Sequence, residues 1–282
     1  MNDSPVSNVS DTSRWIAAYR ASESARADAL FRDPYASLLA GERGRAIAAL
    51  MPRQTRNGWP MIARTKLIDD LVHTAIAEGA DFVLNLAASL DTRPYRLELP
   101  TSLRWVEVDL PTLIEEKRRL LADARQRCRL TRIKVDLANP GARAAVLQDV
   151  AASSRKVLVI TEGLLVYLDE VQVRSLAVDL SAQAAIRWWV LDLTSPALLQ
   201  SLRKTMGKYL ANAPMKFVPS NGIAYFEALG WRVAEVHSML HAAARFRRLA
   251  LVLRIFARFP APDPRNPGQS RWSGVVKLQR PE

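Results

Sequence analysis

Residues 81–111 restrict the fold of this chain more than any other stretch. Phe82–Leu86 is an apolar run with β-branched content, and the small residues Ala87-Ala88-Ser89 follow it directly. Such a run is typical of a strand buried on both faces of a parallel sheet, and small residues allow a sharp turn and close backbone approach. A second strand is predicted over residues 104–110, with Asp109 at its end. An acid there can accept hydrogen bonds from ribose hydroxyls, so the stretch predicts a nucleoside-binding α/β domain.

The rest of the chain continues the alternation of strands and helices. An amphipathic helix is predicted over residues 61–78. A second helix is predicted over residues 112–124, with Thr112 and Glu115 as a capping box. The other predicted elements are a helix at 169–182, strands at 130–137, 156–160 and 186–193, and an antiparallel closing pair at 231–236 and 275–278.

Composition narrows the class of protein. Hydrophobic residues make up 49% of the 282 residues, which is enough for a sizeable core. The single cysteine, Cys128, excludes an intramolecular disulfide framework and a multi-cysteine metal site. The N-terminus lacks the apolar core of a signal peptide, and no run approaches ~18 apolar residues. We therefore expect a cytoplasmic protein without a transmembrane segment; the sequence indicates no metal site and no particular oligomeric state.

The chain is strongly basic, with a formal net charge of +12 and a pI of about 10.3. Because the arginines are scattered, a solvated surface is the favoured interpretation, and contact with nucleic acid or an anionic membrane stays open. Residues 241–259 carry apolar side chains at helical spacing with arginines on another side, which predicts an amphipathic basic helix. Packing on the protein's own core is favoured there over membrane or phosphate contact.

Three groups of motifs resemble one protein family. They are residues 85–97 (NLAASLDTRPYRL) with Glu107–Pro111 and Lys117, Arg64-Thr65 upstream, and residues 162–168 (EGLLVYL) downstream. Together they resemble the leucine carboxyl methyltransferase family, over roughly residues 20–192. The resemblance implies a class I S-adenosylmethionine-dependent methyltransferase: an α/β, Rossmann-like doubly wound sheet with an N-terminal helical cover and a lid insertion after the fifth strand.

The resemblance also implies a set of cofactor-binding residues, namely Arg64, Ala87, Asp109, Asp136, Leu137 and Glu162. Arg64 is expected to hold the methionine carboxylate, although a surface arginine paired with a nearby acid is the alternative. Glu162 is expected to accept from the cofactor's amino group or to orient the substrate. Asp136 and the amide of Leu137 are expected to contact adenine, with a helix cap near residue 140 as the alternative.

The sequence departs from the family pattern at Ala87-Ala88-Ser89. The usual form carries glycine at the first and third of these positions, where glycine allows close approach and unusual dihedrals. We expect binding to survive with lower affinity, and the loss of the cofactor site is the alternative. A non-catalytic binding module on the same fold is therefore one rival hypothesis.

The predicted organisation is an N-terminal tail and helical cover over residues 1–60 and a methyltransferase domain over residues 61–282. Within the first part, residues 1–13 are expected to be a flexible tail, and residues 41–60 a loop after helices broken near residue 33. Within the second, prolines and glycines interrupt apolar and aromatic residues at about 195–221. Because an insertion after the fifth strand commonly covers the acceptor side in such enzymes, the family resemblance implies that this segment is a substrate lid.

The predicted reaction is methyl transfer to oxygen, on a carboxylate or hydroxyl of a small molecule. Positioning and charge placement supply most of the rate in such a displacement. The histidines are isolated in the sequence, and a carboxylate acceptor needs no base, so no catalytic residue is assigned. Arg93, Tyr95 and Tyr167 are candidate substrate-pocket residues. A tRNA- or membrane-associated basic protein is the second rival hypothesis.

Overall fold

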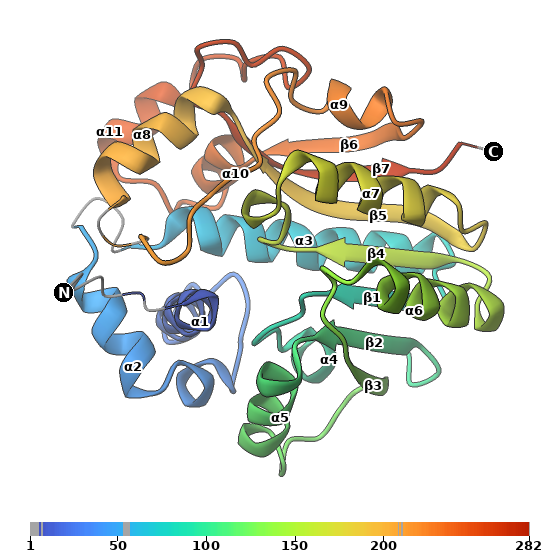
Figure 1. Cartoon of the computed structure of the whole chain (residues 1–282). Helices are drawn as coiled ribbons and strands as arrows, with labels where there is room; N and C mark the ends of the chain where they lie inside the picture. Colours follow the sequence, from blue (N-terminus) through green and yellow to red (C-terminus); the bar gives the residue numbers. More distant parts are fainter. Residues whose placement is uncertain (1–5, 7, 53–56, 208, 210, 282) are drawn as a thin grey trace.

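The structure is a computed structural model that describes residue 6 and residues 8–52, 57–207, 209 and 211–281. Its centre is one seven-stranded sheet with the strand order β3-β2-β1-β4-β5-β7-β6 (Figure 1). The first five strands are parallel to one another, while β7 is antiparallel to both β5 and β6. The strands are β1 Phe82–Leu86, β2 Arg104–Asp109, β3 Arg129–Lys134, β4 Val157–Thr161, β5 Ile186–Thr194, β6 Arg232–Ser238 and β7 Ser273–Gln279.

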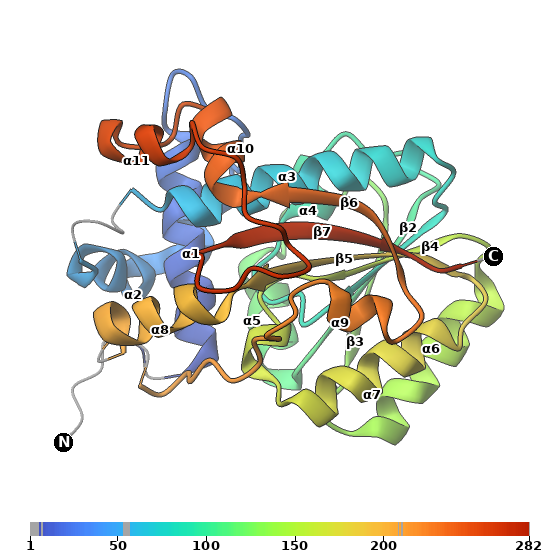
Figure 2. The same ribbon diagram turned by 90° about the horizontal axis from the view of Figure 1, so that it is seen from above.

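Helices cover both faces of the sheet, and β1 shows why the sequence forms this sandwich (Figure 2). Phe82 and Leu84 belong to the core on the side of α6 (Pro140–Ser153) and α7 (Glu170–Ser181). Val83 belongs to the core on the side of α3 (Trp59–Ala77) and α10 (Met239–Arg245). Side chains alternate between the faces of a strand, so a continuous apolar run is needed to fill both layers.

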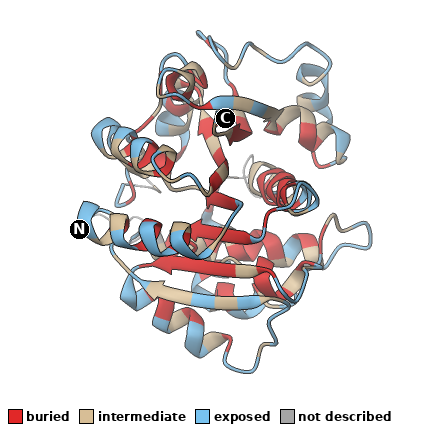
Figure 3. Cartoon of the chain, turned by 90° about the vertical axis from the view of Figure 1, so that its right-hand side faces the viewer, coloured by how far each residue is buried: buried red, intermediate tan, exposed pale blue. Residues whose placement is uncertain are grey.

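Burial falls from the centre of the sheet to its edge. All residues of β1 and β4 are buried, whereas β3 at the edge has no buried residue (Figure 3). The exposed ends of β3 are Arg129 and Lys134. Charges on an edge strand discourage pairing with another chain. None of the described helices is long and apolar enough to cross a bilayer.

The carboxyl ends of β1, β2 and β4 meet at one edge of the sheet, beside α1 (Val9–Ser24) and α2 (Ala36–Leu50). α1 is tied to this edge through Arg20, whose Nε donates to Asp33 Oδ2 at 2.8 Å and whose Nη2 donates to the Leu90 carbonyl at 2.7 Å. The parallel sheet therefore presents its strand ends to a helical N-terminal segment. Shorter helices complete the chain: α4 Arg93–Arg96, α5 Pro111–Leu120, the 3-10 turn η1 Leu165–Tyr167, α8 Pro196–Met206, α9 Ala224–Glu227 and α11 Leu251–Phe256.

Two expectations for the N-terminal segment are wrong. Residues 9–13 are helical and not tail, whereas residues 1–5 and 7 lie outside the described residues. The expected loop over residues 41–60 contains most of α2, because Gly41 only kinks the helix, with φ 56°. Gly44 lies inside α2 because a side chain would not fit there: a Cβ would lie 2.4 Å from the Arg14 carbonyl oxygen. Glycine at this position lets α1 and α2 approach closely.

Three local predictions also need correction. The helix expected over residues 241–259 is two helices, because the chain turns at Arg247 with φ 57° to bury Arg248 against Glu23. The predicted capping box is absent: α5 begins at Pro111, and Glu115 instead pairs with Lys134. Strand β3 ends at Lys134, so residues 135–137 lie beyond it in a loop.

A buried charged cluster beneath α5 gives a test of the fold. Lys117 Nζ donates to Glu107 Oε1 at 2.7 Å, and Arg132 Nε donates to Glu107 Oε2 at 2.9 Å. The Lys117 and Glu107 side chains are fully buried. Glu107→Gln removes the carboxylate to which the buried ammonium donates, so we expect a loss of about 3–5 kcal/mol in the free energy of unfolding by urea denaturation.

The control for this experiment is Glu115→Gln, which removes an exposed carboxylate from α5. It should change the free energy of unfolding far less. Adding Lys117→Met to Glu107→Gln should recover part of the loss, because the unpaired charge is then gone. Equal effects of Glu107→Gln and Glu115→Gln would contradict the assigned role of the buried pair.

Candidate functional site

A cavity of about 1260 Å³ lies at the carboxyl edge of the sheet. Its walls come from the ends of β1, β2, β4 and β5, from α1 and α3, and from α8, α10 and α11. The predicted site residues that line it are Arg64, Ala87, Arg93, Asp109, Asp136, Leu137, Glu162 and Tyr167. In open α/β sheets this edge is where ligands bind.

The turn after β1 has the conformation that glycine usually supplies. Ala87 and Ser89 have φ values of 54° and 44°, both in the left-handed region. The Ala88 amide donates to the Val108 carbonyl at 3.3 Å, and the Ser89 amide donates to Asp109 Oδ2 at 2.6 Å. These bonds to the end of β2 hold the turn in a conformation that costs a non-glycine residue roughly 1–2 kcal/mol. The backbone shape expected of the glycine form is therefore present without glycine.

Asp109 sits at the end of β2 and is almost fully buried. Its Oδ2 accepts from the Ser89 amide, and its Oδ1 accepts from the Leu110 amide at 2.7 Å. Burial raises the pKa of this carboxyl above its usual value, although these two amides act in the opposite direction. Each carboxylate oxygen has a second lone pair, so both can still accept from a hydroxyl in the cavity.

Arg64 lies between two acids at the ends of neighbouring strands. Its Nε donates to Glu162 Oε1 at 2.9 Å, and its Nη1 donates to Asp192 Oδ2 at 3.0 Å. Asp192 Oδ1 also accepts from the Gly163 amide at 2.6 Å. A guanidinium has five N–H donors, so these two bonds leave donors for an incoming carboxylate.

Arg93 joins the same network from the other side. Its Nη1 donates to Glu162 Oε2 and to Asp91 Oδ2, both at 2.8 Å, and its Nε donates to Asp69 Oδ1 at 2.7 Å. Burial disfavours ionisation of Glu162, but the charges of Arg93 and Arg64 outweigh it, so the pKa of Glu162 lies below its usual value. Glu162 is thus a carboxylate shared by two guanidinium groups.

Tyr95 and Tyr167, both candidate substrate-pocket residues, lie in different places. Tyr167 lines the cavity, and burial raises the pKa of its phenol. Tyr95 is buried outside the residues that line the cavity, with its ring edge-to-face on Tyr35 at 5.5 Å and its hydroxyl bonded to Arg132. The position of Tyr95 therefore does not support a role in the substrate pocket.

The loop after β3 brings Asp136 and Leu137 to the cavity. Asp136 is exposed and its Oδ1 accepts from the Ala138 amide at 2.9 Å. The cap of α6 is Asn139, whose Oδ1 accepts from the Ala142 amide at 3.1 Å. The alternative role of Asp136 as the helix cap is therefore wrong.

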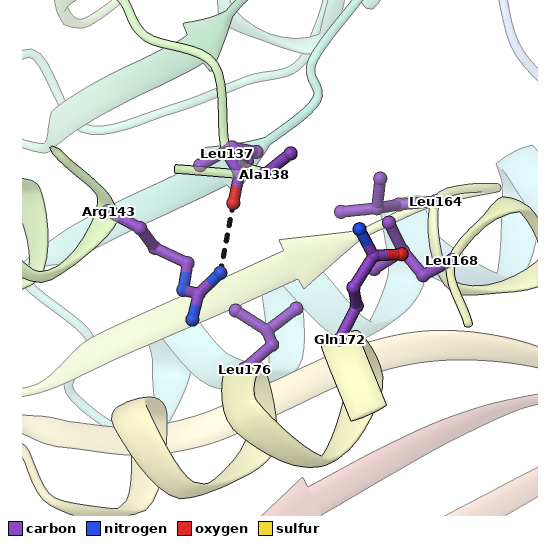
Figure 4. A pocket seen from close by; sticks show the side chains of 7 residues that line it. All are labelled: Leu137, Ala138, Arg143, Leu164, Leu168, Gln172 and Leu176. Atoms are coloured by element: carbon purple, nitrogen blue, oxygen red, sulfur yellow. Dashed lines mark hydrogen bonds between the residues drawn. The ribbon is translucent and has the colours of Figure 1, made fainter. Parts of the chain in front are cut away.

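Arg143 fixes this loop from behind. Its Nη1 donates to the Leu137 carbonyl at 2.9 Å (Figure 4). Its Nε donates to Asp179 Oδ2 at 2.9 Å. A second cavity of about 20 Å³ lies beside this contact, with room for about one water molecule. Arg143 thus connects the loop to α7 and sets the position of the Leu137 backbone.

The structure brings further residues to the site that the sequence did not single out. The position of Asp192 near the end of a predicted strand could have indicated a site residue. Its contact with Arg64, however, forms only because β5 pairs with β4. Ser13 of α1 bonds to the hydroxyl of Ser89, and His241 of α10 lines the cavity. Cys128 lies outside the residues that line it, and burial raises the pKa of its thiol to about 12.

The geometry can be compared with known proteins. A model of the leucine carboxyl methyltransferase family matches residues 13–180. The chain belongs to this family. It is 33% identical to a Frankia alni protein named as an S-adenosyl-L-methionine-dependent methyltransferase. The aligned 257 residues cover 86% of this chain and 88% of that protein. A Streptomyces avermitilis protein of the same description is 32% identical over 256 residues, which cover 86% of this chain and 89% of that protein.

Solved structures support the same fold. A DUF574 family protein from Streptomyces avermitilis superposes with a TM-score of 0.58 and 15% identity, over 96% of this chain and 97% of that one. A Thermobifida fusca protein named as a methyltransferase superposes with a TM-score of 0.57 and 18% identity, over 88% of this chain and 93% of that one. The predicted family and Rossmann-like class are confirmed, and with them the class of S-adenosylmethionine-dependent methyltransferases.

The residues present fit the cofactor of this class. A buried acid closes β2, a left-handed turn exposes backbone at the end of β1, and the arginine of the family motif reaches the same cavity. No group of three or more His, Cys, Asp or Glu side chains suited to a metal ion occurs in the described part of the chain.

The strain in this turn can be tested, because glycine should change the free energy of unfolding in opposite directions at two adjacent positions. Ala87→Gly removes a left-handed alanine, so we expect the free energy of unfolding to rise by up to about 1 kcal/mol. Ala88→Gly, the matched control, should lower it by about 0.5–1 kcal/mol because its φ is not left-handed. Chemical denaturation of both variants measures the difference. A fall in stability for Ala87→Gly would contradict the strain.

Proposed function

We propose that this chain transfers a methyl group from S-adenosylmethionine to an oxygen of a small, largely apolar molecule, with a carboxylate as the favoured acceptor. The observation that carries the proposal is the size and lining of the cavity. Ligand pockets usually have volumes of ≈ 300–1,000 Å³. The volume of about 1260 Å³ exceeds that range and leaves space for a second molecule beside the cofactor.

On the cofactor side, each proposed contact uses a polar group at a strand end. Asp109 would accept from the ribose hydroxyls, and the loop at Asp136 and Leu137 would contact adenine. Arg64 would hold the methionine carboxylate, and Glu162 would accept from the amino group. When bound, the cofactor supplies an electrophilic methyl group on a sulfonium. The chain's own part is to hold charges in place before reaction, because fixed dipoles and ions then need no reorganisation.

On the acceptor side, the cavity wall is apolar and comes mainly from elements after β5. Leu198, Leu202 and Met206 of α8 line it, together with Met215 and Phe217 of the following segment. Met215 and Phe217 lie close to η1, where the Val166 carbonyl accepts from the Phe217 amide at 3.3 Å. We propose that residues 195–221 act as the substrate lid and exclude water from the methyl acceptor.

His241, Glu162 and Asp192 line the cavity and are each hydrogen-bonded to other groups, which favours a carboxylate over a hydroxyl acceptor. His241 Nε2 donates to the Phe259 carbonyl at 2.9 Å, and its Nδ1 lies 3.0 Å from Ser238 Oγ. Glu162 and Asp192 are bonded to guanidinium groups. A carboxylate is already ionised at neutral pH, so it requires no proton removal.

The two rival hypotheses, a non-catalytic binding module and a tRNA- or membrane-associated protein, rest on different features of the chain. The non-catalytic module rested on the missing glycines, and the left-handed turn removes that motivation. A tRNA-bound protein would require RNA affinity that falls steeply with salt. We also propose a cytoplasmic location for the protein, with an N-terminal cover over residues 1–60 and a methyltransferase domain over residues 61–282.

The ribose contact is tested by calorimetric titration with S-adenosylmethionine and S-adenosylhomocysteine. Asp109→Ala should abolish detectable binding, because the hydroxyls would be left unpaired in a buried site. Since burial raises the pKa of Asp109, affinity in the unchanged protein should fall as the pH is lowered through that raised value, when the carboxylate gains its proton. Unchanged affinity in Asp109→Ala would place the ribose elsewhere.

The carboxylate contact is tested with Arg64→Ala. Loss of a charge-assisted bond of ~1.5–3 kcal/mol should weaken cofactor binding by about 10- to 150-fold. Lys66→Ala is the control, because Lys66 lies on the same helix and pairs with Asp70 outside the residues that line the cavity. The double variant Ala87→Gly, Ser89→Gly should tighten binding if those positions limit it.

The acceptor is tested with cofactor carrying a labelled methyl group and a panel of apolar carboxylic acids and matched alcohols. A methyl ester releases labelled methanol in mild base, whereas a methyl ether does not. We expect base-labile label with the acids. Label that is stable to base, formed only with the alcohols, would show a hydroxyl acceptor and contradict the preference for carboxylate.

A further inference from the structure

The region from Arg247 to Phe259, called here the α11 corner, exposes a cluster of large apolar side chains. Leu251 is 76% exposed, Val252 67%, Ile255 56%, Phe256 58% and Phe259 64%. Three residues of the predicted stripe, Phe246, Leu249 and Leu253, do pack on the protein's own core, as favoured from the sequence. Phe256 and the flanking apolar side chains stay outside that packing. A contiguous exposed apolar surface of this kind usually marks an interaction site.

The same corner, together with Arg245 at the end of α10, is positively charged. Arg245, Arg247, Arg254 and Arg258 are exposed, and the sequence contains no acidic residue between Glu235 and Asp263. By contrast, Arg248 is buried and bonds to Glu23 and Asp28, so it serves to anchor the corner to the N-terminal segment. The exposed surface thus combines apolar side chains with arginines that have no acid close in sequence.

The corner also borders the cavity. Leu253 and Phe256 of α11 line it, and the His241 contact ties the Phe259 backbone to α10. α11 lies on the outer side of α10, at the end of the molecule that also holds α2 and α8 (Figures 1 and 2). A flat surface that met this corner would therefore lie beside one wall of the cavity.

We propose that the α11 corner docks on the surface of an anionic lipid bilayer. Exposed leucine, isoleucine and phenylalanine side chains would enter the boundary between headgroups and acyl chains, and the arginines would pair with anionic headgroups. The six residues of α11 are too few to span a membrane, so the contact is interfacial.

Two other occupants fit less well. In a symmetric dimer through this corner the exposed arginines of both copies would face one another, and like charges oppose that contact. Nucleic acid would satisfy the arginines but leave the aliphatic side chains exposed, because phosphate recognition uses no such groups. An anionic bilayer satisfies both parts of the surface.

The test is flotation of the full chain with vesicles of phosphatidylcholine alone or of phosphatidylcholine and phosphatidylglycerol in equal parts. We expect the chain to float with the anionic vesicles and to stay behind with the neutral ones. Leu251→Gln with Ile255→Gln should abolish flotation. Arg247→Gln with Arg258→Gln should lower the partition coefficient about 10- to 30-fold, since each basic residue contributes roughly 5-fold.

Matched controls make the same substitutions elsewhere on the surface. Val171→Gln with Val178→Gln changes two exposed apolar residues of α7, and Arg118→Gln with Arg119→Gln changes two exposed arginines of α5. Both should float like the unchanged chain. Circular dichroism verifies that each variant is folded.

The proposal is overturned if the unchanged chain ignores both vesicle types, or if the α5 and α7 variants lose flotation as the α11 variants do. It is also overturned if sedimentation shows a dimer that Ile255→Gln dissociates while flotation is absent. Binding of RNA that survives Leu251→Gln, without flotation, would assign the surface to nucleic acid instead. Flotation needs neither cofactor nor acceptor, so its outcome is independent of the proposed methyl transfer.

Discussion

The site depends on two buried guanidinium groups that share carboxylates from separate segments of the chain. Arg64 comes from α3 and Arg93 from α4, and both bond to Glu162 after β4. Arg93 also returns to α3 through Asp69, and Arg64 reaches β5 through Asp192. Buried charges are tolerated only when they are paired and hydrogen-bonded. The network therefore fixes how the helix, the turn and two strand ends sit relative to one another.

Much of the fold could be predicted because its central elements carry local signals. The apolar run of β1 has the same bounds in the structure as in the sequence, and the helix opened by Asp169 begins with that residue as its cap. These elements follow from burial and capping within a few residues. The failures came where distant contacts decided the backbone. Arg248 is buried because it bonds to Glu23, which lies 225 positions away in the sequence, and no periodicity between residues 241 and 259 reveals that partner.

Some residues of the candidate site could be predicted from the sequence, and others could not. The polar residues at strand ends were found because parallel strands bring their carboxyl ends to one edge, and the family motifs named them. The bonding of Arg64 to Asp192 could not be predicted, since it requires knowledge that β5 lies beside β4. The same applies to the apolar walls contributed by α8 and α11, whose residues lie far apart in the sequence and meet only through tertiary packing.

The left-handed turn at Ala87 and Ser89 has a consequence for how such sites are recognised. Its shape is imposed by the end of β2, through the Val108 carbonyl and the Asp109 carboxylate, and not by the freedom of the residues that adopt it. A search that looks for glycine at these positions would pass over this chain. What persists here is a pair of backbone angles held in place by a neighbouring strand, and the residue type is free to vary within the limits of size and strain.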